Sequence, residues 1–163
     1  MIALGFDPGL ATTGYGVVKK INSRYYHIAH GTIRTPSTKS IPERLVTIYQ
    51  SARELIQKYK PNTIGVERLY FEKNVTNGIY VAQARGVLLL AMAHEGLPLV
   101  ELSPTEVKIA LVGYGRAEKV QVQSMIQRLL LLDSIPKPDD AADALAIALC
   151  ALHIQFFPNN LGN

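Results

Sequence analysis

The chain has 163 residues, of which 48% are hydrophobic and 18% charged, a composition typical of a globular domain that excludes a disordered chain. Its formal net charge of +4 is a mild excess of cations, which favours an anionic partner without requiring one. A single cysteine excludes an internal disulfide framework, while an N-terminus without signal-peptide features and a longest apolar run near residues 86–93 predict a cytoplasmic protein without a membrane span.

The first third of the chain has the pattern of an antiparallel meander. Residues 2–7 (IALGFD) form an apolar run of strand length, which ends at the Gly/Pro-rich turn PGLATTG. Two more strands are predicted at 15–20 and 25–35, around a turn at Asn22-Ser23. A capping box with an early proline, SIPE at 40–43, then predicts a helix that runs to about Tyr59.

The rest of the chain alternates between helices and strands. Strands are predicted at 63–67 (TIGVE) and 98–102 (PLVEL), separated by a long helix over 74–95 that Gly96 ends. Two shorter helices near 104–111 and 117–132 and a last helix after Asp139 complete the pattern. A meander followed by alternation predicts an α/β fold with a mixed five-stranded sheet flanked by helices. We expect one domain over residues 1–158 and a short C-terminal tail over 159–163.

Three aspartates lie at the start of the last predicted helix, in the stretch KPDDAADALAIALCALH (137–153). Helix capping is one explanation, because a helix N-terminus attracts negative charge and Asp140 and Asp143 have capping-box spacing. The alternative is a site completed by acids from elsewhere in the chain. Asp7 ends the first predicted strand and Glu67 the fourth. If these strands are parallel neighbours, both side chains reach one cleft at the carboxyl ends of the strands.

Four carboxylates in one cleft repel one another unless cations neutralise them. Oxygen ligands without His or Cys favour Mg²⁺ or Mn²⁺ over zinc. Such a set suits two ions, one activating a water and the other stabilising the leaving oxygen of a phosphodiester. Taken singly, each strand-end acid has a plainer explanation: Asp7 as a turn residue before Pro8, and Glu67 as an exposed strand end. The coincidence of all four acids favours a metal-dependent site.

Five segments, in order and across nearly the whole chain, resemble the RuvC family of Holliday-junction resolvases: IALGFDPGLATTGYGVV, GVERLYFEKN, AQARGVLLLAM, VKIALVGYGRAEKVQVQSMI and DDAADALAIAL. The resemblance implies a ribonuclease-H-like fold and an endonuclease that uses two Mg²⁺ ions, with Mn²⁺ as a substitute. The family acids fall on Asp7, Glu67, Asp140 and Asp143. By resemblance Asp7 bridges both ions, Glu67 and Asp143 hold one each, and Asp140 stands where some members carry His. Asp139 lies one place outside the pattern, and we expect it to cap the helix.

The resemblance also implies a substrate and partners. The family acts as a homodimer on four-way DNA junctions, in recombination and repair, and nicks two strands symmetrically to leave 5′-phosphates. A twofold enzyme matches a twofold substrate, with one site for each cut strand. The RuvA–RuvB branch-migration complex is the expected protein partner.

Three residues match family positions expected to contact DNA, and Arg116 is a fourth candidate. Tyr70 stands at an aromatic position that is expected to stack on a base at the opened crossover. Lys108 and Lys119 match basic positions near the cleft, and Arg116 lies in the Gly-rich loop GYGRAEK, which can approach a DNA backbone closely. The plainer alternatives are a half-buried loop tyrosine and solvated lysines. Three more cations can widen the phosphate-binding track, although each is individually expected to be an ordinary surface charge: Arg68, Lys73 and Arg85.

Two features of the helices carry a structural expectation. Cys150 and His153 have no second pair of metal ligands nearby in sequence, so a core cysteine and a helix-end histidine are favoured over a metal site. Gly78 and Gly86 allow close packing of the long helix, either at a dimer seam or against the sheet.

Three rival classes share some of these features. A phosphotransferase of the actin and sugar-kinase type begins with a similar strand and turn, but it needs two such domains, which 163 residues do not provide. A non-catalytic DNA-binding module has no use for four acids that repel DNA. A related short nuclease with another nucleic-acid substrate is the alternative that the sequence separates least well.

Overall fold

The computed structural model describes residues 1–69 and 75–156, without the side chains of 75–77 and 155–156. Tyr70, Lys73 and the predicted tail over 159–163 therefore lie outside the described residues. Five strands form one sheet in the order β3-β2-β1-β4-β5. Their bounds are β1 Ile2–Asp7, β2 Thr12–Ile21, β3 Arg24–Arg34, β4 Thr63–Glu67 and β5 Leu99–Leu102.

The sheet is mixed, as the meander followed by alternation predicts. β1 pairs antiparallel with β2, and β2 with β3. β1 also pairs parallel with β4, and β4 with β5. β1 is therefore the central strand, and the carboxyl ends of β1 and β4 lie side by side at one edge of the sheet.

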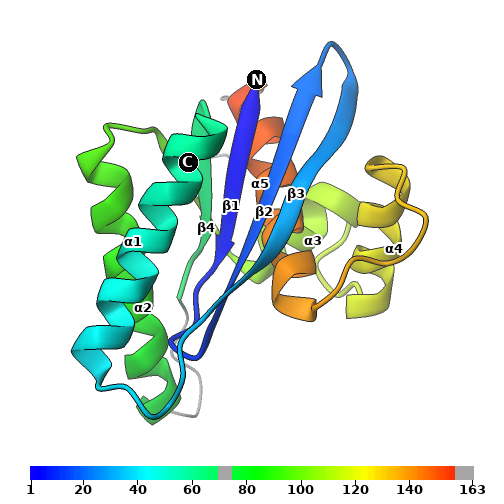
Figure 1. Cartoon of the computed structure of the whole chain (residues 1–163). Helices are drawn as coiled ribbons and strands as arrows, with labels where there is room; N and C mark the ends of the chain where they lie inside the picture. Colours follow the sequence, from blue (N-terminus) through cyan, green and yellow to red (C-terminus); the bar gives the residue numbers. More distant parts are fainter. Residues whose placement is uncertain (70–74, 157–163) are drawn as a thin grey trace, which may run out of the picture.

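Helices cover both faces of the sheet, giving three layers (Figure 1). α1 (Ile41–Tyr59) and α2 (Val75–His94) lie on one face, while α3 (Pro104–Val112), α4 (Lys119–Leu129) and α5 (Asp139–Phe156) lie on the other. The helix and strand types expected from the sequence are confirmed throughout. The boundaries differ by a few residues, most clearly at β2, which begins at Thr12 and not at residue 15.

Alternation along β1 and β4 divides the core into two clusters. Leu4 and Phe6 of β1 and Ile64 and Val66 of β4 pack towards α1 and α2. Ala3 belongs to the opposite cluster, which α5 dominates. Because side chains of a strand alternate between its faces, Asp7 and Glu67 share the face that α5 covers.

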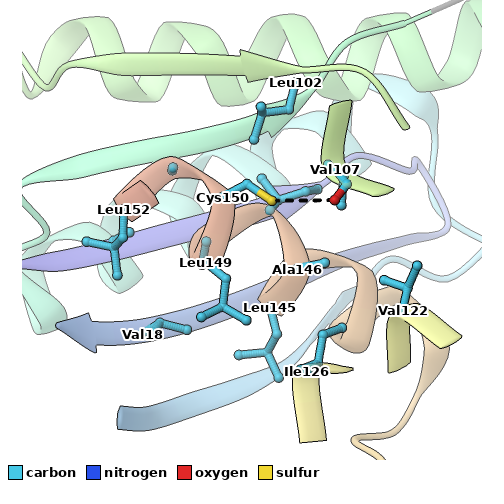
Figure 2. Packing of buried hydrophobic residues seen from close by; sticks show 14 of the residues in the cluster. Val18, Leu102, Val107, Val122, Ile126, Leu145, Ala146, Leu149, Cys150 and Leu152 are labelled. Carbon is cyan, nitrogen blue, oxygen red and sulfur yellow. Dashed lines mark hydrogen bonds between the residues drawn. The ribbon is translucent and has the colours of Figure 1, made fainter. Parts of the chain in front are cut away.

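The helix α5 is buried almost all round, with every residue from Ala144 to Leu152 buried. An all-round apolar helix belongs in a protein interior, which explains the long run of Ala, Leu and Ile. Figure 2 shows Leu145, Leu149 and Cys150 packed among residues of β2, α3 and α4. The Cys150 thiol faces the Val107 carbonyl oxygen at 3.9 Å, so the predicted core cysteine is confirmed.

Candidate active site

Asp7 and Glu67 end two adjacent parallel strands. Phe6 pairs with Val66 in the β1–β4 register, which places the next residue of each strand at the same edge. The proposed condition for a shared cleft, that these two strands are parallel neighbours, is thus fulfilled. The two carboxyl groups are hydrogen-bonded to each other.

The start of α5 packs directly on the backbone of β2, because the β2 residues that face it, Gly14 and Gly16, have no side chains. A Cβ atom on Gly14 would overlap the carbonyl oxygen of Asp140, and one on Gly16 would lie 2.6 Å from the amide nitrogen of Leu145. Gly14 is the register partner of Asp7. The first turn of α5, with Asp140 and Asp143, is therefore held beside the end of β1 by direct backbone packing.

The ionisation of Asp7 is altered by its burial and by the acids around it. Burial raises the pKa of Asp7 to about 8, and the negative charges of Glu67, Asp143 and Asp140 add to this rise. Burial also raises the pKa of Glu67 and of Asp143. In the absence of a cation, the site therefore retains a proton at neutral pH, which the Asp7 carboxyl donates to Glu67.

Lys119, the first residue of α4, partly compensates this negative charge. Its ammonium lies 2.9 Å from Asp143 Oδ2 and 3.2 Å from Asp139 Oδ2. Burial acts to lower the pKa of Lys119, but its bonds to Asp143 and Asp139 raise it overall. The expected position of Lys119 near the cleft is confirmed, although in this state it contacts carboxylates.

The expectation that Asp139 caps α5 is wrong. Asp139 is the first residue inside the helix, and the carbonyl oxygen of Pro138 accepts from the amides of Ala141 and Ala142. The Asp139 side chain instead accepts from Lys119 and from Gln123 Nε2, at 3.3 Å. A cation on the neighbouring helix thus draws this carboxylate away from the helix N-terminus.

Two hollows lie beside the acids. One, of about 250 Å³, is lined by Glu67, Asp143, Lys108 and Lys119 together with apolar residues of α3, α4 and α5. The other, of about 530 Å³, lies next to Asp140. The acids therefore stand between two spaces, and the predicted cations Lys108 and Lys119 both line the first.

Arg116 does not reach the acids as closely. It is exposed in the loop between α3 and α4 and lines neither of these two hollows. Tyr70 lies outside the described residues, so its expected role at the crossover stays a prediction.

Arg85 of α2 is a structural residue, and the expectation of a surface charge is wrong. Its side chain is only 16% exposed, its Nε donates to the Glu67 carbonyl oxygen at 3.0 Å, and its guanidinium pairs with Glu101. It thereby ties α2 to the end of β4, where Glu67 stands. Arg85 is the only Lys, Arg, Asp or Glu between residues 75 and 94, which marks it as unusual, but this signal does not say what the side chain contacts.

The donor set suits a hard divalent cation. It offers carboxylate oxygens alone. Burial raises the pKa of Asp7 and repulsion by the other acids raises it further, and a bound cation relieves this repulsion. Among residues 1–69 and 75–156, no three His, Cys, Asp or Glu side chains are already arranged to hold an ion. Asp143 points to Lys119 and Asp7 to Glu67, so metal binding requires these side chains to rotate.

A family model described as "Crossover junction endodeoxyribonuclease RuvC" matches residues 3–151. The chain belongs to the RuvC family. It is 50% identical over 153 residues to the crossover junction endodeoxyribonuclease of Heliobacterium modesticaldum, covering 94% of each chain. It is 46% identical over 163 residues to that of Clostridioides difficile, covering 100% of this chain and 96% of the relative.

Two solved structures of RuvC from Thermus thermophilus have the same fold as this chain. The RuvC structure of Thermus thermophilus superposes with a TM-score of 0.89, at 30% identity and covering 97% of both chains. The structure of T. thermophilus RuvC in complex with Holliday junction substrate superposes with a TM-score of 0.88, at 32% identity and covering 92% of both chains. The predicted ribonuclease-H-like fold is therefore confirmed. No helix in the described part of the chain combines the length and hydropathy that a bilayer crossing requires.

Proposed function

We propose that the chain is an endonuclease that resolves four-way DNA junctions, cutting two strands symmetrically and leaving 5′-phosphates. The observation that carries this proposal is the convergence of four acids, Asp7, Glu67, Asp140 and Asp143, at one edge of a RuvC-family sheet. The T. thermophilus relative, whose structure holds a Holliday junction substrate, supports the choice of DNA. The biological roles that follow are homologous recombination and DNA repair.

Mg²⁺ is the cofactor we propose, with Mn²⁺ able to replace it and with the four acids as ligands. Two such ions, when bound, supply an activated water and stabilise the leaving oxygen. The protein holds the carboxylates in place through the β1–β4 pairing and the packing of α5 on Gly14 and Gly16. Lys108 and Lys119, which line the hollow next to Glu67 and Asp143, present positive charge to the scissile phosphate.

A homodimer is the proposed assembly, with α2 at the seam. One face of α2 is exposed along its length and is largely apolar; its residues are Ile79, Gln83, Gly86 and Leu90. The single chain has nothing within 4 Å of a Cβ atom built on Gly86, so a second helix has room to approach there. The RuvA–RuvB branch-migration complex remains the proposed partner of the dimer.

A labelled synthetic four-way junction tests the proposal, with a linear duplex of the same sequence as the control substrate. With Mg²⁺ we expect paired nicks at symmetric positions in the junction, ligatable because of their 5′-phosphates, and no nicks with EDTA. Equal cutting of the linear duplex would instead favour the alternative, a related ribonuclease-H-like nuclease with another nucleic-acid substrate.

A further inference from the structure

The hollow beside Asp140 has a rigid frame of its own. Its walls are the loop 9–11, the starts of β2, α1 and α5, and Tyr80 of α2. Gly9 and Thr13 are joined by a hydrogen bond of 2.7 Å from Thr13 Oγ1 to the Gly9 carbonyl oxygen. Thr35 fastens the other side, since its amide donates to the Ala11 carbonyl oxygen at 3.0 Å and its hydroxyl to that of Leu10.

Arg44 supplies the cation of this hollow. Its Nε donates to Thr35 Oγ1 at 2.9 Å, and Thr35 is buried, so the guanidinium is fixed by a neutral partner. No carboxylate of residues 1–69 and 75–156 with a described side chain lies within 4.0 Å of it. By contrast Arg53, nine residues further along α1, is paired with Glu95 at 2.9 Å. Arg44 is thus a half-buried, oriented cation to which the described residues bring no carboxylate within 4.0 Å.

A DNA strand that is cut at the four acids must extend away from them in both directions. Lys108 and Lys119 line the hollow on one side, and Arg44 and Tyr80 line the hollow on the other, about 530 Å³ in volume and large enough for a nucleotide. Arginine is suited to phosphate because its planar fork donates two parallel hydrogen bonds.

We propose that the hollow beside Asp140 binds the backbone of the cut strand, with Arg44 holding the phosphate next to the one that is cut. This inference rests on the proposed nuclease function and adds to it a substrate contact. Arg44 sets the register of the strand, because it fixes one phosphate at a set distance from the carboxylates.

Junction binding at several salt concentrations in EDTA tests the charge. For Arg44→Gln we expect the slope of log affinity against log salt to fall by ~0.9 for each subunit bound. Arg44→Lys retains the charge and should keep the parent slope. Arg53→Ala removes the same charge from the far part of α1 and should also keep it. Thr35→Val removes the hydrogen bond to Arg44 Nε but leaves the charge, so it should keep the parent slope. If Arg44 served only to hold the structure together, Thr35→Val would instead change the slope as Arg44→Gln does.

A neutral methylphosphonate placed at each phosphate next to the scissile one tests the position. This gives two modified junctions, one for each side of the scissile phosphate. We expect the parent to bind one of them about as weakly as Arg44→Gln binds the unmodified junction. Arg44→Gln should bind that same modified junction no more weakly than it binds the unmodified one. The inference is overturned if the parent tolerates both neutral junctions, or if Arg44→Gln has the slope of Arg53→Ala. Failure of the parent to nick any junction in Mg²⁺ would instead contradict the nuclease function itself.

Discussion

Asp7 is the residue with the most strongly altered ionisation in the site. Burial and the charges of Glu67, Asp143 and Asp140 raise its pKa from 3.8 to about 8 in the metal-free fold. Between about pH 4 and pH 8 the folded protein therefore binds a proton that the unfolded chain has released. The free energy of unfolding must fall as the pH rises through this window, because the unfolded state binds fewer protons.

Asp7→Asn removes this titration, so the metal-free variant should lose stability less steeply between pH 4.5 and pH 8.5 than the parent does. We expect it to be more stable than the parent at pH 8.5 by an amount on the order of a few kcal/mol, and to differ least at pH 4.5. Urea unfolding in EDTA at both values measures the effect. Asp133→Asn, at an exposed carboxyl outside the site, should leave the slope unchanged. Parallel curves for Asp7→Asn and the parent would contradict the assigned burial and repulsion.

Cys150 should be chemically inert in the folded protein. Burial raises the pKa of its thiol to about 12, so the reactive thiolate is scarce at pH 8, and the core around it excludes reagent. Ellman's reagent should therefore titrate no thiol in the native protein and one thiol per chain in 6 M guanidinium chloride. Rapid reaction of the native protein would place Cys150 outside the core.

At the scale of elements, the packing of α5 on the sheet decides where the acids stand. Three glycines of β1 and β2, Gly5, Gly14 and Gly16, each face the α5 backbone so closely that a Cβ atom would overlap it. Sequence periodicity predicts the helix, but it does not predict which strands the helix crosses or at what distance. The position of Asp140 and Asp143 beside Asp7 depends on this contact between segments far apart in the chain.

Gly16→Ala tests the contact. The new methyl group would lie 2.6 to 2.7 Å from backbone atoms of Leu145, so α5 has to shift. We expect a loss of stability of ~1–3 kcal/mol and slower junction cleavage, because Asp140 and Asp143 move with the helix. Gln50→Ala is the control, since Gln50 is exposed on α1, which lies on the other face of the sheet from α5, and alanine favours a helix. Thermal unfolding and nicking rates compare the two, and equal behaviour would contradict the close approach.

The sequence was sufficient to predict the element types, the strand pairing of the meander and the place of Asp7 and Glu67, because these depend on local periodicity and on residues at strand ends. The role of Arg85 and the partner of Asp139 could not be predicted, because both depend on which helix lies opposite. Arg85 meets the end of β4 only after α2 has packed on the sheet, and Asp139 meets Lys119 only after α4 has packed against α5. The contact of Arg44 could not be predicted either, because its partner Thr35 lies outside α1, directly after β3.

At the scale of the whole molecule, the exposed face of α2 predicts how two chains associate. Leu90 is 51% exposed on that face, so Leu90→Glu should place a charge in the proposed seam and dissociate the dimer. Val120→Glu, at a side chain 53% exposed on α4, should leave it intact. Sedimentation equilibrium at micromolar concentration distinguishes them. A parent protein that is monomeric there and fully active in junction cleavage would contradict the dimer.

Nicking and binding by Asp7→Asn, measured side by side on one labelled junction, test the central claim that the four acids form the catalytic metal site. The substitution preserves size and removes one negative charge at the end of β1. With Mg²⁺ we predict that nicking falls by several orders of magnitude, because the ions are no longer held. In EDTA at pH 8.5, where Asp7 of the parent has largely lost its proton, we predict junction binding at least as tight as the parent's, because one carboxylate no longer repels the phosphates. Nicking by Asp7→Asn at the parent rate would contradict the account.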